Sequence, residues 1–135
     1  MPVVLRTNPP ADPASLARIG QSEPRLPRAY LHYLGKSNGA EGDLGVEPGW
    51  FVVWPAEDAV SFSNEYGVAT YLPGYFAFGG NGGGELFVFD LNLAQDDPPV
   101  LMVPAVGLAA EEMRLVADSF TEFESHIGKE QRDAV

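Results

Sequence analysis

The 135-residue chain contains no cysteine and has few positively charged side chains. Without cysteine it forms no disulfide, offers no thiol nucleophile and cannot hold zinc or an iron–sulfur cluster through sulfur. Only 8 Lys and Arg residues stand against 19 Asp and Glu residues, for a formal net charge of -11. A surface of this sign repels nucleic acids and anionic membranes, so we expect neither as a partner. It favours a basic protein partner, because opposite fields speed encounter.

Long apolar runs are also missing. The apolar segment near the N-terminus is short and ends at Pro9-Pro10, which is not typical of a signal peptide. No stretch approaches the ~20 apolar residues of a membrane helix. Together with the lack of cysteine, this predicts a protein of the reducing cytoplasm. The length and the 45% apolar content fit one domain over residues 1–135. Within it we expect an extended arm at 1–11 and a frayed polar tail at 129–135.

Two helices are predicted in the first third of the chain. Asp12-Pro13 combines a capping carboxylate with a proline suited to the first helical position, and Gly20 is expected to end that helix after Ile19. The second helix is expected to begin near Pro27 and to end at Asn38-Gly39. Its predicted core residues are Tyr30, Leu31 and Leu34. The acidic segment 39–49 is predicted to be a loop.

The middle of the chain is rich in predicted strands. The run from Trp50 to Trp54 has no polar alternation, which predicts a strand buried on both faces. A short helix over 56–66 should follow, with Val60 and either Phe62 or Tyr66 facing inward. Pro73-Gly74 indicates a turn. Further strands are predicted at 75–78, 85–91 and 100–103.

The last predicted helix has the clearest local signature. Ser119 and Glu122 match a capping box, in which each side chain accepts a hydrogen bond from a free backbone amide. Phe120, Phe123 and Ile127 share one helical face, and Gly128 should end the helix. Taken together, the pattern predicts a single α+β domain with a mostly antiparallel central sheet flanked by helices.

A glycine-rich segment separates two of the predicted strands. It consists of Gly79, Gly80, Asn81, Gly82, Gly83 and Gly84. A phosphate-binding loop would need a following Lys and a helix, but Glu85 and a strand come next. A dinucleotide fingerprint starting at Gly80 would also place Glu85 at its last glycine position. We therefore predict a structural hairpin turn and no cofactor.

Other motifs that carry chemistry fail on their context. Residues 35–39 match G-x-S-x-G around Ser37, but a helix precedes this serine where a nucleophile elbow needs a strand. A small serine hydrolase is therefore only a remote alternative. Residues 90–95 begin like a calcium loop but lack its third ligand and its glycine. His32 and His126 lie far apart in the sequence, so no metal site is predicted. We assign no catalytic residue.

Acidic residues cluster on both sides of the tryptophan-containing strand. They are Glu41, Asp43 and Glu47 before it and Glu57, Asp58 and Glu65 after it. Such clusters are often no more than a solvated surface, but they also suit docking of a basic protein. Tyr66 and Tyr71 would add the amphipathic anchors that dominate interfaces, unless they pack in the core. These eight residues form the predicted partner-binding set.

Three segments in order resemble the SMI1/KNR4 family, also called the SUKH superfamily. Residues 26–30 (LPRAY), with Leu34 and then Asn38-Gly39, resemble its "LP-x-x-Y … L … NG" opening. Residues 71–79 (YLPGYFAFG), followed by 81–85 (NGGGE), look like its central glycine block. Residues 119–123 (SFTEF) look like its closing helix. Asn81 stands where many relatives carry aspartate, and both residues are turn formers.

The resemblance implies an α+β fold with a largely antiparallel sheet. It implies a non-enzymatic protein-binding role, because many bacterial members are immunity proteins that neutralise a cognate toxin, often a nuclease. Fungal members regulate cell-wall synthesis through protein contacts, which leaves a general regulatory module as the alternative. The family transfers neither catalytic nor contact residues to this chain. The sequence leaves the oligomeric state open.

Overall fold

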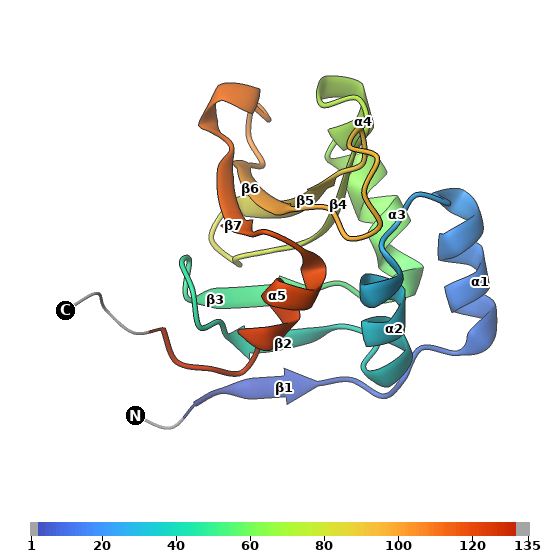
Figure 1. Ribbon diagram of the computed structural model, residues 1–135, viewed down its shortest axis with the longest axis vertical. Coiled ribbons are helices and arrows are strands. Elements are labelled where there is room, and N and C mark those ends of the chain that lie inside the picture. The colour runs from blue at the N-terminus through green and yellow to red at the C-terminus, as the bar shows by residue number, and fades with distance from the viewer. Residues whose placement is uncertain (1–2, 132–135) are drawn as a thin grey trace.

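A computed structural model describes residues 3–131 of the chain (Figure 1). In this part, seven strands form one antiparallel sheet whose spatial order is the sequence order. The strands are β1 (Leu5–Thr7), β2 (Ala40–Asp43), β3 (Trp50–Val53), β4 (Tyr75–Gly80), β5 (Glu85–Asp90), β6 (Val100–Pro104) and β7 (Arg114–Ala117). The helices are α1 (Pro13–Ser22), α2 (Arg28–Lys36), α3 (Ala56–Glu65), α4 (Val68–Tyr71) and α5 (Phe120–Ser125). The predicted α+β class is confirmed.

The first sheet edge holds two strands that the sequence pattern did not indicate. The N-terminal arm includes strand β1, where Leu5 pairs with Gly42. Residues 40–43 were predicted as loop but form β2, with Ala40 and Gly42 buried and Glu41 and Asp43 half-buried. The alternation is present, but its inward positions hold Ala and Gly, which add little apolar signal to the sequence pattern.

The first two helices follow their predicted starting signals. The carboxylate of Asp12 caps α1 by accepting a hydrogen bond from Ser15 N at 2.9 Å, as expected. The helix continues through Gly20 to Ser22, because Ile19 is anchored in the core and its carbonyl still accepts from Glu23 N. In α2 the buried residues are Tyr30, Tyr33 and Leu34, whereas Leu31 is only half-buried.

Strand β3 is not buried on both faces. Phe51 and Val53 point into the core, but Trp50 and Val52 are only half-buried. The following helix ends at Glu65, and its buried residues are small: Ala56, Ala59 and Ser63. Small residues allow α3 to pack tightly on β4, where the Ser63 hydroxyl accepts from Ala77 N at 3.2 Å. Val60 and Phe62 are half-buried, and Tyr66 is 46% exposed.

The predicted β4–β5 hairpin is confirmed, but its turn is shorter than the glycine run. Gly79 and Gly80 belong to β4, where they pair with Val53 and Val52 of β3. A Cβ on Gly79 would lie 2.0 Å from the Val52 carbonyl oxygen, so the close approach of two strands requires glycine there. The turn proper is Asn81 to Gly84, with positive φ at Gly82 and Gly84.

The C-terminal part also contains an unpredicted strand, β7, which pairs with β6 at the second sheet edge. At α5, the Ser119 hydroxyl accepts from Glu122 N at 3.0 Å, as predicted. The returning bond differs, because the Glu122 carboxylate accepts from Asp118 N, one residue earlier than a capping box requires. Residues 129–131 are exposed coil, and 132–135 of the predicted tail lie outside the described residues.

The two faces of the sheet are covered differently. Helices α2 and α5 lie over one face of the sheet (Figure 1). On this side, together with Ile19 of α1, lies the main core of aromatic rings. The other face holds a smaller cluster, made of Val68, Leu72, Ala77, Leu86, Val88, Val103 and Leu108, in which α4 contributes the first residue and the position after α4 the second. This smaller cluster does not extend over β3. We call the two sides the covered face and the open face.

Candidate protein-binding surface

The open face is only partly covered around β3, where Trp50 and Val52 are half-buried. Cross-strand pairing places Arg6, Glu41, Val52, Gly80 and Leu86 in one row across five strands, on one side of the sheet. Two residues further along β2, on the same side of the sheet, Asp43 pairs with Trp50 of β3. The row changes from charged at β1 and β2 to apolar at β3 and β5, with a side-chain gap at glycine. This pattern differs from the continuous apolar core on the covered face.

A hollow of about 280 Å³ lies where the row has its gap. It is lined by the following residues: Val52, Trp54, Tyr66, Glu85, Leu86, Ala105 and the glycine residues 80, 82 and 84. Trp54 and Tyr66 form one wall, and the glycine turn forms another. We call this the glycine hollow. Its lining residues offer mainly apolar side chains and glycine backbone to a visitor.

A second hollow of about 240 Å³ adjoins the first, because both share Trp54 and Tyr66. Phe62 and Glu65 complete its lining. The Trp54 ring meets Phe62 edge-on, with centroids 5.2 Å apart, and is nearly parallel to Tyr66 at 6.1 Å. We call this the aromatic hollow. The open face therefore has two adjoining hollows, each about the size of a side chain, and the Glu65 carboxylate lines one of them.

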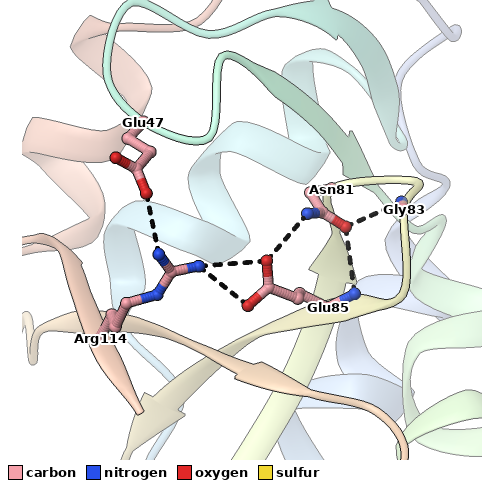
Figure 2. Close-up of polar contacts among 5 residues, drawn as sticks. All are labelled: Glu47, Asn81, Gly83, Glu85 and Arg114. Carbon is pink, nitrogen blue, oxygen red and sulfur yellow. Dashed lines mark hydrogen bonds and ion pairs between the residues drawn. The ribbon is translucent and has the colours of Figure 1, made fainter. Parts of the chain in front are cut away.

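Side-chain hydrogen bonds hold the glycine turn in place (Figure 2). The Asn81 side-chain oxygen accepts from Gly83 N at 2.8 Å and from Glu85 N at 3.1 Å. The Glu85 carboxylate accepts from the Asn81 amide and from Arg114, which also pairs with Glu47 at 2.9 Å (Figure 2). The network therefore ties the turn to β7 and to the segment before β3. It gives the glycine hollow a defined wall.

The first predicted acidic cluster is largely committed to internal contacts. Glu41 lies 3.7 Å from Arg6, and the Asp43 carboxylate accepts from Val4 N at 2.7 Å. Glu47 pairs with Arg114. These carboxylates remain at the surface, but each already has a polar or positively charged neighbour. Their attraction for a partner is correspondingly reduced.

The residues of the second acidic cluster lie at opposite ends of α3. At its start, both oxygens of the Glu57 carboxylate accept from the Asn38 amide, which lowers the pKa of Glu57. At its end, Glu65 lies in the aromatic hollow with Tyr66. In the described part of the chain, neither Asp58 nor Glu65 takes part in an ion pair. Tyr71 is 67% exposed on α4.

Two of the eight predicted residues, Glu65 and Tyr66, line the aromatic hollow together. The first cluster precedes β3 in the chain, and Glu57 and Asp58 follow it at the start of α3. The sequence pattern does not single out three residues that shape this surface: Trp54, Phe62 and Arg114. The four-residue spacing of Phe62 and Tyr66 on a helix is a usable signal, because such residues share one helical face. The same spacing also fits core packing, so it does not reveal the hollow by itself.

Ser37 occupies a structural position. Its side chain is buried, its hydroxyl donates to the Gly39 carbonyl at 2.8 Å, and its oxygen accepts from Asn8 N at 3.3 Å. It thus closes the turn after α2.

Between residues 3 and 131, no group of three His, Asp or Glu side chains has an arrangement suited to a metal ion. Over the same residues, none of the helices combines the length and the hydropathy that crossing a bilayer requires.

A larger depression, with a volume of about 950 Å³, lies elsewhere, between the α1–α2 connection and the segment 91–97. Several of its polar groups are engaged in hydrogen bonds or ion pairs. Arg25 pairs with Glu23 at 2.9 Å and donates to the Leu91 carbonyl, and Asp97 accepts from Phe120 N at the start of α5. These bonds join loops to helices, so we interpret this depression as a structural junction.

Comparison with known proteins relates this fold to one family. No curated protein matches the chain. A sequence model of the SMI1 / KNR4 family (SUKH-1) matches residues 10–126, which is most of the 135-residue chain. The match includes all three segments that resemble the family and extends further toward the N-terminus. This chain belongs to the SMI1/KNR4 family (SUKH-1).

Proposed function

We propose that this chain is a non-enzymatic protein-binding domain that acts as an immunity protein. It would bind a cognate basic toxin, for example a nuclease domain, and neutralise it by covering the active-site cleft. Membership of the SMI1/KNR4 family carries this proposal, because many bacterial members have that role. The open face supports it, since half-exposed aromatic residues beside carboxylates suit a cationic protein surface.

The physical basis is occlusion with electrostatic attraction. A nuclease cleft is lined by positive charge because it holds phosphates. A partner with a net charge of -11 is attracted to such a cleft at long range. Aromatic side chains that dock in the cleft would then add desolvated contact area. The substrate is excluded by volume, so no chemical step is required.

The decisive experiment is to co-express the chain with a candidate toxin, sought among the genes that neighbour its own. We expect growth to be rescued by the wild-type chain, and we expect the two purified proteins to form a complex. Rescue without a complex would contradict occlusion. Stable binding to a cellular protein that is not a toxin would instead support the regulatory alternative.

Salt dependence tests the electrostatic part. We expect the association rate to fall steeply between low and physiological ionic strength, while the dissociation rate changes less. Stopped-flow mixing of the two proteins measures both rates. An association rate that does not depend on salt would contradict the electrostatic mechanism.

Charge reversal tests which end of β3 faces the partner. Glu41→Lys and Asp58→Lys each reverse one accessible carboxylate, in different acidic clusters. Glu111→Lys is the matched control, on an exposed 3₁₀ turn far along the chain. We expect at least one cluster variant to weaken the complex more than the control. Equal binding by all three would show that the partner docks elsewhere.

A further inference from the structure

The aromatic hollow combines aromatic rings with an accessible carboxylate. Three aromatic side chains, Trp54, Phe62 and Tyr66, line it, and the fourth lining residue is Glu65. Glu65 and Tyr66 are exposed, so the hollow is open to a visitor. Among the described residues, no Lys or Arg lines it, and none forms an ion pair with Glu65. Its carboxylate is therefore available.

The size of the hollow restricts its occupant. Pockets for drug-sized ligands have volumes of about 300–1,000 Å³. The aromatic hollow, at about 240 Å³, suits a single side chain. The faces of aromatic rings attract cations, and a neighbouring carboxylate adds an ion pair. A cationic side chain of a protein partner satisfies both.

The ring geometry favours arginine among cationic side chains. Trp54 and Tyr66 are nearly parallel, with an angle of 6° between their planes, so they offer flat faces of one orientation. A planar guanidinium stacks on such a face while its N–H groups still reach a carboxylate in its own plane. An ammonium group forms only point contacts, and its stronger hydration makes it costlier to bury there.

We propose that the aromatic hollow is a socket for one arginine side chain of the protein partner. The guanidinium stacks on the free face of one ring of the stacked Trp54–Tyr66 pair and pairs with the Glu65 carboxylate. The neighbouring glycine hollow then receives an apolar side chain next to that arginine, because Val52, Leu86 and glycine backbone line it and the carboxylate of its remaining charged residue, Glu85, is already paired with Arg114. This inference rests on the proposed protein-binding function and states what the bound surface must present.

Small probes test the socket without the partner. The full chain is titrated with Nα-acetyl-arginine N-methylamide, and the indole N–H signals of Trp50 and Trp54 are followed by NMR. We expect a saturable shift of the Trp54 signal at millimolar probe concentration. The citrulline analogue is neutral but has nearly the same shape, and we expect it to bind roughly tenfold more weakly.

Two further probes define what would overturn the proposal. The lysine analogue should bind more weakly than the arginine probe. Choline tests whether the hollow is a cage for quaternary ammonium, and tighter binding of choline than of arginine would overturn the arginine assignment. Equal binding of arginine and citrulline, or no saturable shift of Trp54, would overturn it as well.

Variants locate the binding. Tyr66→Ala removes a wall and Glu65→Gln removes the charge, and each should weaken the arginine probe several-fold. Tyr66→Phe keeps the ring and should restore binding. Glu111→Gln is the matched control, because it removes an exposed carboxylate outside the hollow. Both mutated residues are exposed, and far-UV circular dichroism checks that each variant is folded. Equal binding by Glu65→Gln and Glu111→Gln would overturn the proposal.

The failure of this proposal can be separated from failure of the proposed function. If the toxin is neutralised but the arginine probe does not bind, the function stands and the socket is wrong. If the probe binds at Trp54 but no toxin is neutralised, the socket stands and the immunity role is wrong.

Discussion

The two faces of the sheet use aromatic side chains in opposite ways. On the covered face, the rings of Phe78 and Phe89 stack with centroids 4.4 Å apart, and Tyr30 and Phe120 pack edge-on against them. All four side chains are fully buried. On the open face, Trp54 contacts Phe62 and Tyr66, and Tyr66 is 46% exposed. The same residue types make a core on one side and a partly solvated surface on the other.

This difference indicates that the aromatic rings of the covered face stabilise the fold, whereas those of the open face are available for binding. The buried rings contribute most of the apolar area removed from water, which is the main source of folding free energy. Because the covered face stabilises the domain, β3 can keep Trp50 and Val52 half-exposed on the other side. A core ring should therefore matter for stability, and a ring of the open face should matter for binding.

Removing one ring from each face gives the largest expected contrast. Phe78 contacts rings of α2, β5 and α5, so Phe78→Ala should cost about 3–5 kcal/mol in the free energy of unfolding. Tyr66→Ala should cost only about 1 kcal/mol, because the ring is half-exposed. Urea denaturation measures both. Similar losses for the two variants would contradict this difference between the two faces.

The glycine run offers a second contrast, between β4 and the turn. Gly79→Ala should cost roughly 3 kcal/mol, because its Cβ would meet the Val52 carbonyl at 2.0 Å and two paired strands would have to separate. Gly84→Ala has open space around it and should cost about 1–2 kcal/mol, from its positive φ alone. Thermal and urea unfolding of both variants test this. A smaller loss at position 79 would show that β3 and β4 do not pass so closely.

The covered face also has a weak point. Among the described residues, the Tyr30 hydroxyl is the buried side-chain group without a hydrogen-bond partner, and burial raises its pKa. Tyr30→Phe should therefore raise the free energy of unfolding by about 1 kcal/mol. Urea denaturation of the variant beside the wild-type chain measures the change. A loss of stability would show that the hydroxyl has a partner in solution.

The smallest expected effect concerns a surface contact and pH. The Asn38 amide holds the pKa of Glu57 below its ordinary value, so folding favours the ionised carboxylate. The ionised Glu57 carboxylate therefore adds to the free energy of unfolding at neutral pH, and this addition is lost as the pH falls through the lowered pKa. Glu57→Gln should lower the free energy of unfolding by only a few tenths of a kcal/mol at pH 7, because the contact is exposed. Below the lowered pKa the substitution should have no effect on this free energy.

Asp58→Asn is the matched control for that measurement. It removes a charge at the same helix start and therefore reports the helix-dipole contribution that both residues share. Unfolding curves of both variants across the acidic range give the comparison. If the loss caused by Glu57→Gln grew on acidification, the carboxylate would not be stabilised in its ionised form by folding.

Local signals predicted several elements well. The Asp12 and Ser119 caps, the start of α2 near Pro27 and the β4–β5 hairpin were all readable, because they depend on residues close in sequence. The ordered motifs also indicated the family, which is confirmed over residues 10–126. Of the predicted partner-binding residues, Glu65 and Tyr66 fall in one hollow, but the partner itself stays a prediction.

By itself, the sequence determined the α+β class, the absence of thiol and disulfide chemistry, the negative charge and the positions of the capped helices. Only the tertiary structure decided that 5–7, 40–43 and 114–117 are strands, because each is stabilised by pairing with a neighbouring strand. It also decided that Gly79 lies in a strand and that Trp54, Phe62 and Glu65 meet in one hollow. Strand pairing and pocket formation bring together residues that are far apart in the sequence. Local sequence preference does not indicate which of these residues come into contact.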